Sequence, residues 1–81
     1  MREQSEFSKR LQNLREQQNR SRRMVSELCG LPTSAFGKYE RGEAKPDLDS
    51  LVAIADYFEV SIDYLIGRVN DPFKGHRKKK L

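Results

Sequence analysis

The sequence contains one cysteine (Cys29), one histidine (His76) and no tryptophan. A lone cysteine cannot close an intrachain disulfide, and in a short, highly charged chain it is typical of a reducing compartment. The sole histidine lies in the C-terminal stretch that reads as a tail, so we expect no histidine-based metal site and no histidine-based catalytic triad. We therefore expect no metal or other cofactor, a cytoplasmic location, and a Cys29 that is a small core residue rather than a nucleophile.

Long apolar runs are also missing from the chain. No segment approaches the ~18 apolar residues that a membrane-spanning helix needs, and residues 1–10 lack the apolar centre of a signal peptide. There is no glycine-rich phosphate loop, and the carboxylates fall mostly on expected helix surfaces. The sequence therefore indicates a soluble protein with no membrane partner, no small-molecule ligand and no enzymatic activity. Its 81 residues are room for one domain.

Apolar residues recur with helical spacing, and no segment alternates as a strand would. Phe7, Leu11 and Leu14 predict a first helix over residues 6–18. Side chains that accept backbone hydrogen bonds begin later helices, and glycines end them. The expected starts are Ser21, Asp47 and Ser61, and the expected ends are Gly30, Gly42 and Gly67.

Pro32 suits the first position of a third helix, which we expect over residues 32–41. Short helices joined by short connections predict an all-α fold, a compact five-helix bundle over residues 6–67. No apolar periodicity remains after Gly67. Residues 68–81 are therefore interpreted as a basic, flexible C-terminal tail.

The net charge of +4 is unevenly distributed. Residues 68–81 carry +5, and residues 9–41 also carry +5, from eight basic and three acidic side chains. Residues 42–67 carry −5. One half of the domain is thus suited to face a polyanion and the other is not; the alternative is an arbitrary mixture of surface charges.

The positive half contains two short helices separated by a tight turn, Cys29-Gly30-Leu31-Pro32. This arrangement over residues 21–41 is the pattern of a helix-turn-helix unit, formed by the second and third helices. The major groove of DNA admits one helix, while the preceding helix crosses the backbone.

Three segments resemble the Cro/C1-type (XRE) helix-turn-helix proteins. They are Phe7-x-x-Arg10-Leu11-x-x-Leu14-Arg15, Lys38-Tyr39-Glu40-Arg41-Gly42-Glu43-x-Lys45-Pro46-x-Leu48 and Val60-Ser61-Ile62-Asp63-Tyr64-Leu65-Ile66-Gly67. The resemblance covers residues 7–67 and implies a lambda-repressor-like domain of bacterial or phage origin. It implies a sequence-specific transcriptional regulator, expected to be a nucleoid-associated repressor. It also implies a homodimer bound to a palindromic operator in double-stranded DNA.

The resemblance assigns roles to residues by their position. The expected base-contacting residues are Thr33, Ser34, Lys38 and Gly37, and the expected phosphate-contacting residues are Arg22, Arg23, Arg41 and Lys45. At Gly37 the absence of a side chain would let the backbone approach DNA. Arg22 departs from the family, which usually has glutamine there. The alternatives are helix capping by Thr33 and Ser34, a tolerated glycine at an exposed site, and simply solvated arginines.

Other positions carry structural roles in the family. Arg15 and Glu40 are expected to form a partly buried salt bridge between the first and third helices. Dimer contacts in similar proteins most often come from the C-terminal helices. The candidates here are Tyr57, Tyr64 and Ile66, and the alternative is that these side chains complete the core of the monomer.

Two other functions remain open at the level of sequence. One is an antitoxin or adaptor-type module that uses the same helical bundle to bind a partner protein. The other is non-specific nucleic-acid binding driven by the run His76-Arg77-Lys78-Lys79-Lys80. That run is equally compatible with an arm that attracts phosphates, a linker to a further domain and an artificial addition.

Overall fold

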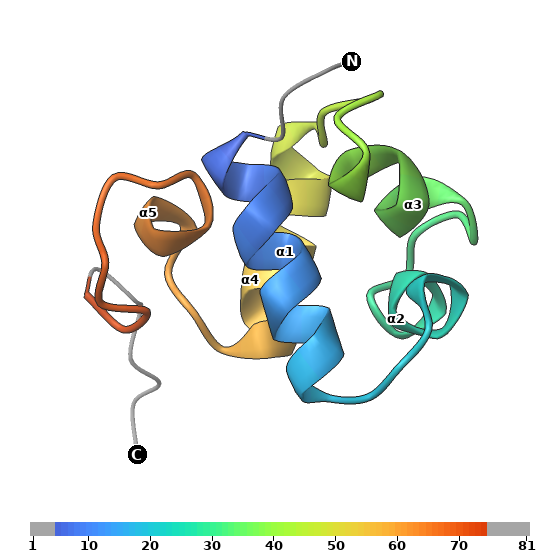
Figure 1. Cartoon of the computed structure of the whole chain (residues 1–81), viewed down its shortest axis with the longest axis horizontal. Helices are drawn as coiled ribbons and strands as arrows, with labels where there is room; N and C mark the ends of the chain where they lie inside the picture. The colour runs from blue at the N-terminus through green and yellow to red at the C-terminus, as the bar shows by residue number, and fades with distance from the viewer. Residues whose placement is uncertain (1–4, 75–81) are drawn as a thin grey trace.

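The computed structural model describes residues 5–74, which form five α-helices and no strand. The helices are α1 (Glu6–Gln17), α2 (Arg22–Leu28), α3 (Ala35–Glu40), α4 (Leu48–Phe58) and α5 (Ile62–Leu65). α1 crosses in front of α4, with α5 on one side and the pair of α2 and α3 on the other (Figure 1). This arrangement confirms the expected all-α five-helix bundle. Within residues 5–74, no helix is long and apolar enough to span a membrane.

Side chains cap the starts of four helices. The capping residues are Ser5, Ser21, Asp47 and Ser61, and each accepts a hydrogen bond from the backbone N–H three residues later. Three of these caps were expected from the sequence. The hydrogen bonds from Ser50 to the Asp47 carboxylate lower the pKa of Asp47 below its ordinary value, because they favour the ionised form.

The third helix begins later than the sequence suggested. The prediction that it starts at Pro32 is wrong, because α3 is regular only from Ala35. The Ala35 N–H donates to the carbonyl of Pro32, three residues earlier, at 2.9 Å, which closes a tight turn rather than an α-helical turn. Ser34 precedes α3 and makes no side-chain capping hydrogen bond. Thr33 and Ser34 therefore lie in the turn that leads into α3.

The hydrophobic core draws on every helix and on the connection before α5. Its buried members are Leu11, Val25, Ala35, Phe36, Tyr39, Ile54, Ala55, Val60 and Leu65. Phe36 of α3 is fully buried, and its ring packs against Tyr39 and Phe58 with centroid separations of 6.4 and 6.2 Å. The inner side of α3 is thus anchored in the core, which leaves its outer side as a fixed surface.

The chain continues to pack against the domain beyond the expected boundary at residue 67. The Arg10 guanidinium of α1 donates to the carbonyl of Val69 at 2.6 Å and to Asn70 Oδ1 at 2.9 Å. The Ser61 N–H donates to the carbonyl of Pro72 at 2.7 Å. Residues 68–74, expected to belong to the tail, therefore fold back onto α1 and α5. The lysine run lies in residues 75–81, outside the described residues.

Candidate nucleic-acid interface

A buried serine joins the two helices of the helix-turn-helix. The Ser26 hydroxyl donates to the Arg22 carbonyl at 2.8 Å and accepts from the Phe36 N–H at 3.0 Å. Gly30 in the connecting turn has φ +76°, a conformation that side chains disfavour. The bonds fix α2 relative to α3. The sequence reasoning missed Ser26, because its bond to the Phe36 N–H joins residues ten positions apart and no local pattern signals it.

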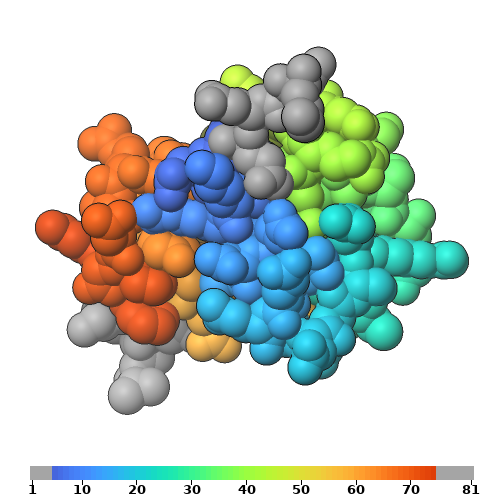
Figure 2. All heavy atoms as spheres, in the orientation of Figure 1, coloured from blue at the N-terminus to red at the C-terminus, as the bar shows by residue number. Residues whose placement is uncertain are grey.

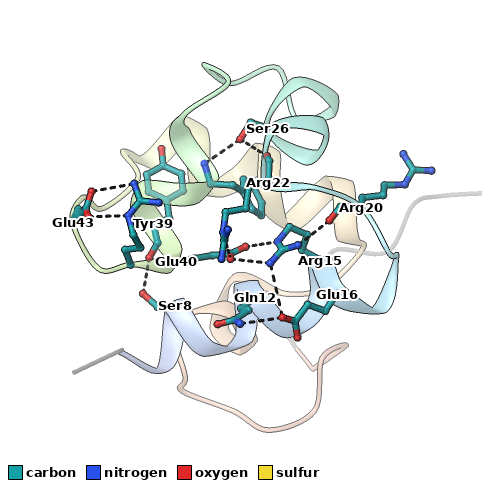
Figure 3. Close-up of polar contacts among 12 residues, drawn as sticks. Ser8, Gln12, Arg15, Glu16, Arg20, Arg22, Ser26, Tyr39, Glu40 and Glu43 are labelled. Atoms are coloured by element: carbon teal, nitrogen blue, oxygen red, sulfur yellow. Dashed lines mark hydrogen bonds and ion pairs between the residues drawn. The ribbon is translucent and has the colours of Figure 1, made fainter. Parts of the chain in front are cut away.

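Glu40 is the centre of an ion-pair cluster that joins three helices (Figure 3). Its side chain is 2% exposed, and its Oε2 accepts from Arg15 Nε at 2.7 Å. Glu40 Oε1 accepts from Arg15 Nη2 at 3.1 Å and from Arg22 Nε at 2.9 Å. The bond to Glu40 raises the pKa of Arg15, because it stabilises the charged guanidinium. The structure thus brings together Arg15 and Glu40 and adds Arg22 as a third member.

Arg22 links this buried cluster to the surface. Its side chain is 49% exposed, and its only hydrogen bond to residues 5–74 uses Nε. Its two Nη groups keep their donors for another partner. The sequence reasoning expected Arg22 to contact phosphate and missed its pairing with Glu40, which no local pattern signals.

Thr33, Ser34 and Lys38 are exposed, and Ser34 and Lys38 are separated by one helical turn and so share a side. Lys38 and Lys45 form no ion pair with any residue between 5 and 74. Arg23 is 77% exposed and lies 3.5 Å from Glu27. Apart from Gly37, the expected contact residues therefore lie on the surface of α2, of α3 and of the segments that flank α3.

Gly37 differs from the exposed glycine considered in the sequence. It is buried, because arginine side chains cover it. A Cβ atom at Gly37 would lie 2.9 Å from Arg41 Nη1 and 3.6 Å from Arg22 Cδ. Arg41 in turn donates from Nε and Nη2 to the Glu43 carboxylate, at 2.8 and 3.2 Å. These hydrogen bonds raise the pKa of Arg41.

The opposite flank of the molecule carries the expected dimer residues. Figure 2 shows residues of α5 and the following segment, in orange to red, on the side away from α2 and α3. Tyr57 and Tyr64 are half-buried against the core; Tyr57 donates to Gln18 Oε1 at 2.6 Å, and the Arg10 guanidinium lies 4.4 Å from the Tyr64 ring centroid. Ile66 is 43% exposed. Both tyrosines thus contribute to the monomer.

Two observations on residues 5–74 concern nucleophilic and metal chemistry. Burial raises the pKa of the Cys29 thiol to about 11, which keeps the thiol protonated near neutral pH and unreactive. Among residues 5–74, no three side chains of the types that bind metals gather closely enough to hold an ion.

Comparison with known proteins identifies relatives of the chain. A helix-turn-helix family profile matches residues 11–65. The chain is 35% identical over 75 residues to YobD, an uncharacterised HTH-type transcriptional regulator of Bacillus subtilis. The aligned region covers 93% of this chain and 67% of YobD. It is 39% identical over 62 residues to RstR, a cryptic phage CTXphi transcriptional repressor of Vibrio cholerae. That aligned region covers 76% of this chain and 55% of RstR.

Solved structures share the fold. The P22 c2 repressor, crystallised with a synthetic operator, superposes with a TM-score of 0.72 at 22% identity, over 78% of this chain and 96% of that one. A transcriptional regulator from Listeria innocua superposes with a TM-score of 0.70 at 35% identity, over 78% and 59%. The chain spans about half to two thirds of the length of relatives such as RstR and YobD. It belongs to the Cro/C1-type (XRE) helix-turn-helix family of DNA-binding transcriptional regulators.

Proposed function

We propose that this chain represses transcription by binding a specific sequence in double-stranded DNA, with α3 and the turn before it in the major groove. One observation carries the proposal: exposed Thr33, Ser34 and Lys38 lie on the outer side of a helix-turn-helix. The inner side of that unit is fixed by fully buried Phe36. A rigid helix with polar donors on its free side is suited to reading base edges.

Base recognition is proposed for the side chains at the start of α3. Hydroxyl groups donate or accept hydrogen bonds, so Thr33 and Ser34 suit several base edges. The Lys38 ammonium suits guanine, whose O6 and N7 both accept in the major groove. Because Lys38 has no ion-pair partner among residues 5–74, contact with DNA requires no internal bond to break.

Phosphate contacts are proposed for the cations around this surface. Arg22, Arg23 and Lys45 are exposed, and the acidic residues of the net −5 segment lie in the second half of the domain. Arg22 is held by Glu40 through Nε alone, so its Nη groups can bind a phosphate oxygen without loss of the cluster. Such contacts add affinity and salt dependence but no sequence information.

The proposal includes a homodimer on a palindromic operator. Two recognition helices would then enter successive major grooves about 34–36 Å apart. Support comes from the flank opposite α2, where Phe73 is 66% and Ile66 is 43% exposed. A shallow groove of about 440 Å³ beside Phe73 is lined by Leu14, Tyr57 and Tyr64 among others. An exposed apolar side chain beside such a groove suits contact with a second copy.

Relatives of the chain are named as a transcriptional regulator and a transcriptional repressor, which disfavours an antitoxin or adaptor role. A gel-shift assay with fragments of genomic DNA over a series of salt concentrations tests the proposed function. We expect a small set of fragments to shift at protein concentrations that leave the others free. The proposal is refuted if all fragments bind alike, or if affinity does not fall with salt.

A further inference from the structure

We propose that Arg41 is a base-reading residue that recognises guanine, with Gly37 providing the space for its guanidinium and Glu43 setting its orientation. This inference rests on the proposed DNA binding by α3. It replaces the phosphate contact that the sequence suggested for Arg41, and it replaces the direct approach of the Gly37 backbone to DNA.

The guanidinium of Arg41 lies over Gly37. Arg41 follows Gly37 by four residues and its N–H donates to the Gly37 carbonyl at 3.0 Å, so both lie on the same side of α3. The Arg41 side chain lies back over Gly37, since a Cβ there would be 2.9 Å from Arg41 Nη1. Real Cβ contacts are essentially never closer than 3.0 Å. The guanidinium therefore occupies the place that a side chain at position 37 would take on the reading surface.

Glu43 holds the guanidinium of Arg41 in one orientation. Glu43 accepts from Arg41 Nε at 2.8 Å and from Nη2 at 3.2 Å, which engages one edge of the group. The other edge, between Nη1 and Nη2, keeps its outward N–H donors. Arg41 Nη1 forms no hydrogen bond with residues 5–74. Two parallel donors at this spacing match O6 and N7 of guanine in the major groove.

The charge balance favours a base over a phosphate. Arg41 and Glu43 form an ion pair that is close to neutral as a unit, with side chains 53% and 51% exposed. A neutral pair gives little of the counterion release that drives phosphate binding. It nevertheless keeps directional hydrogen bonds, because the carboxylate fixes the plane of the guanidinium. Glu43 is in this way a positioning residue.

The test is selection of bound duplexes from a double-stranded DNA pool with a randomised centre, using the full 81-residue chain. The variants are Arg41→Ala, Arg41→Lys and Gly37→Ala, and the control is Arg68→Ala. Arg68 is also exposed and ion-paired, 3.7 Å from Asp63, but it follows α5 on the other flank. Gly37→Ala should still fold, because alanine favours helix and only the flexible end of Arg41 must move.

We expect the wild-type protein and Arg68→Ala to select one guanine per half-site that Arg41→Ala no longer selects and that Arg41→Lys, which lacks the two parallel donors, selects more weakly. Discrimination at that base pair should fall on the order of tenfold to a hundredfold, with other positions unchanged. Gly37→Ala should weaken the same preference, because its methyl group displaces the guanidinium.

Two results would overturn the inference. If Arg41→Ala weakens all duplexes alike and leaves the consensus intact, Arg41 binds phosphate. If Arg41→Lys keeps the guanine preference in full, a bidentate guanidinium is not what reads the base. A wild-type protein that selects no consensus at all instead refutes the proposed function itself, and the inference with it.

Discussion

Arg22 Nε lies 2.9 Å from Glu40 Oε1, so the arginine that occupies the family's glutamine position is ion-paired within the protein before any DNA is present. The same carboxylate binds Arg15. A single buried anion therefore fixes α1, α2 and α3 relative to one another, and it also fixes the base of a side chain that reaches the surface.

Replacement of Glu40 by glutamine should destabilise the fold severely. The change leaves the mostly buried Arg15 guanidinium without its counter-charge, which costs about 3–5 kcal/mol of unfolding free energy. Urea denaturation measures the loss. The matched control is Glu43→Gln, because Glu43 is half-exposed and pairs with an exposed arginine; its effect should stay within about 1 kcal/mol. Equal effects of the two variants would contradict the account of Glu40.

Replacement of Arg22 by alanine should weaken binding to all DNA sequences alike. The salt dependence of binding, log K against log salt, should lose a slope of about one, as expected for one phosphate contact. Stability should change little, because Arg15 still neutralises Glu40. Affinity titrations at several salt concentrations provide the measurement. An unchanged slope, or a loss confined to particular sequences, would rule out the phosphate role.

Local signals in the sequence were sufficient to predict that five helices exist and where three of them begin. The caps at Ser21, Asp47 and Ser61 act within one turn, so they are visible in a short stretch of residues. The start of α3 was misjudged for the same local reason. Pro32 is favourable at a first helical position, but here it is part of the turn that precedes α3.

Contacts between distant residues were not visible in the same way. The bond between Arg10 and Asn70 spans 60 positions, and the pair of Arg22 and Glu40 spans 18. From sequence alone an arginine is interpreted as a solvated charge, because its carbonyl or carboxylate partner comes close to it only in the packed fold. The burial of Gly37 beneath the Arg41 side chain was missed, because the conformation of that side chain is not specified by any rule of sequence spacing.

Replacement of Arg10 by alanine should release residues 68–74 from the domain. The guanidinium donates to the carbonyls of Tyr64 and Val69, and these acceptors lose their partner. We expect faster amide hydrogen exchange at Ser61, whose N–H is bonded to Pro72, with the exchange of α3 unchanged. Arg68→Ala is the control, because within residues 5–74 the side chain of Arg68 forms a single ion pair, which is exposed and joins it to Asp63. Unaltered exchange at Ser61 would show that Arg10 does not hold this segment.

Asp47 should make stability depend on acid pH. Its pKa is lowered in the folded state by hydrogen bonds from Ser50, so the folded protein binds this proton less readily than the unfolded chain. The contribution is fully present above the unfolded pKa of about 4 and is lost as pH falls through the lower folded value. Asp47→Asn keeps a capping side chain but removes the titration. Urea denaturation against pH should therefore show a shallower acid dependence for the variant; identical profiles would contradict this role.

The most direct test of groove reading by α3 concerns Lys38. The affinities of the wild-type protein and of Lys38→Ala are measured for the selected operator and for each of its single-base-pair changes. The account predicts a loss of about 1–3 kcal/mol for the variant, with discrimination relaxed at one base pair per half-site and kept at the others. A uniform loss across all duplexes, or no loss at all, would contradict the placement of α3 in the major groove.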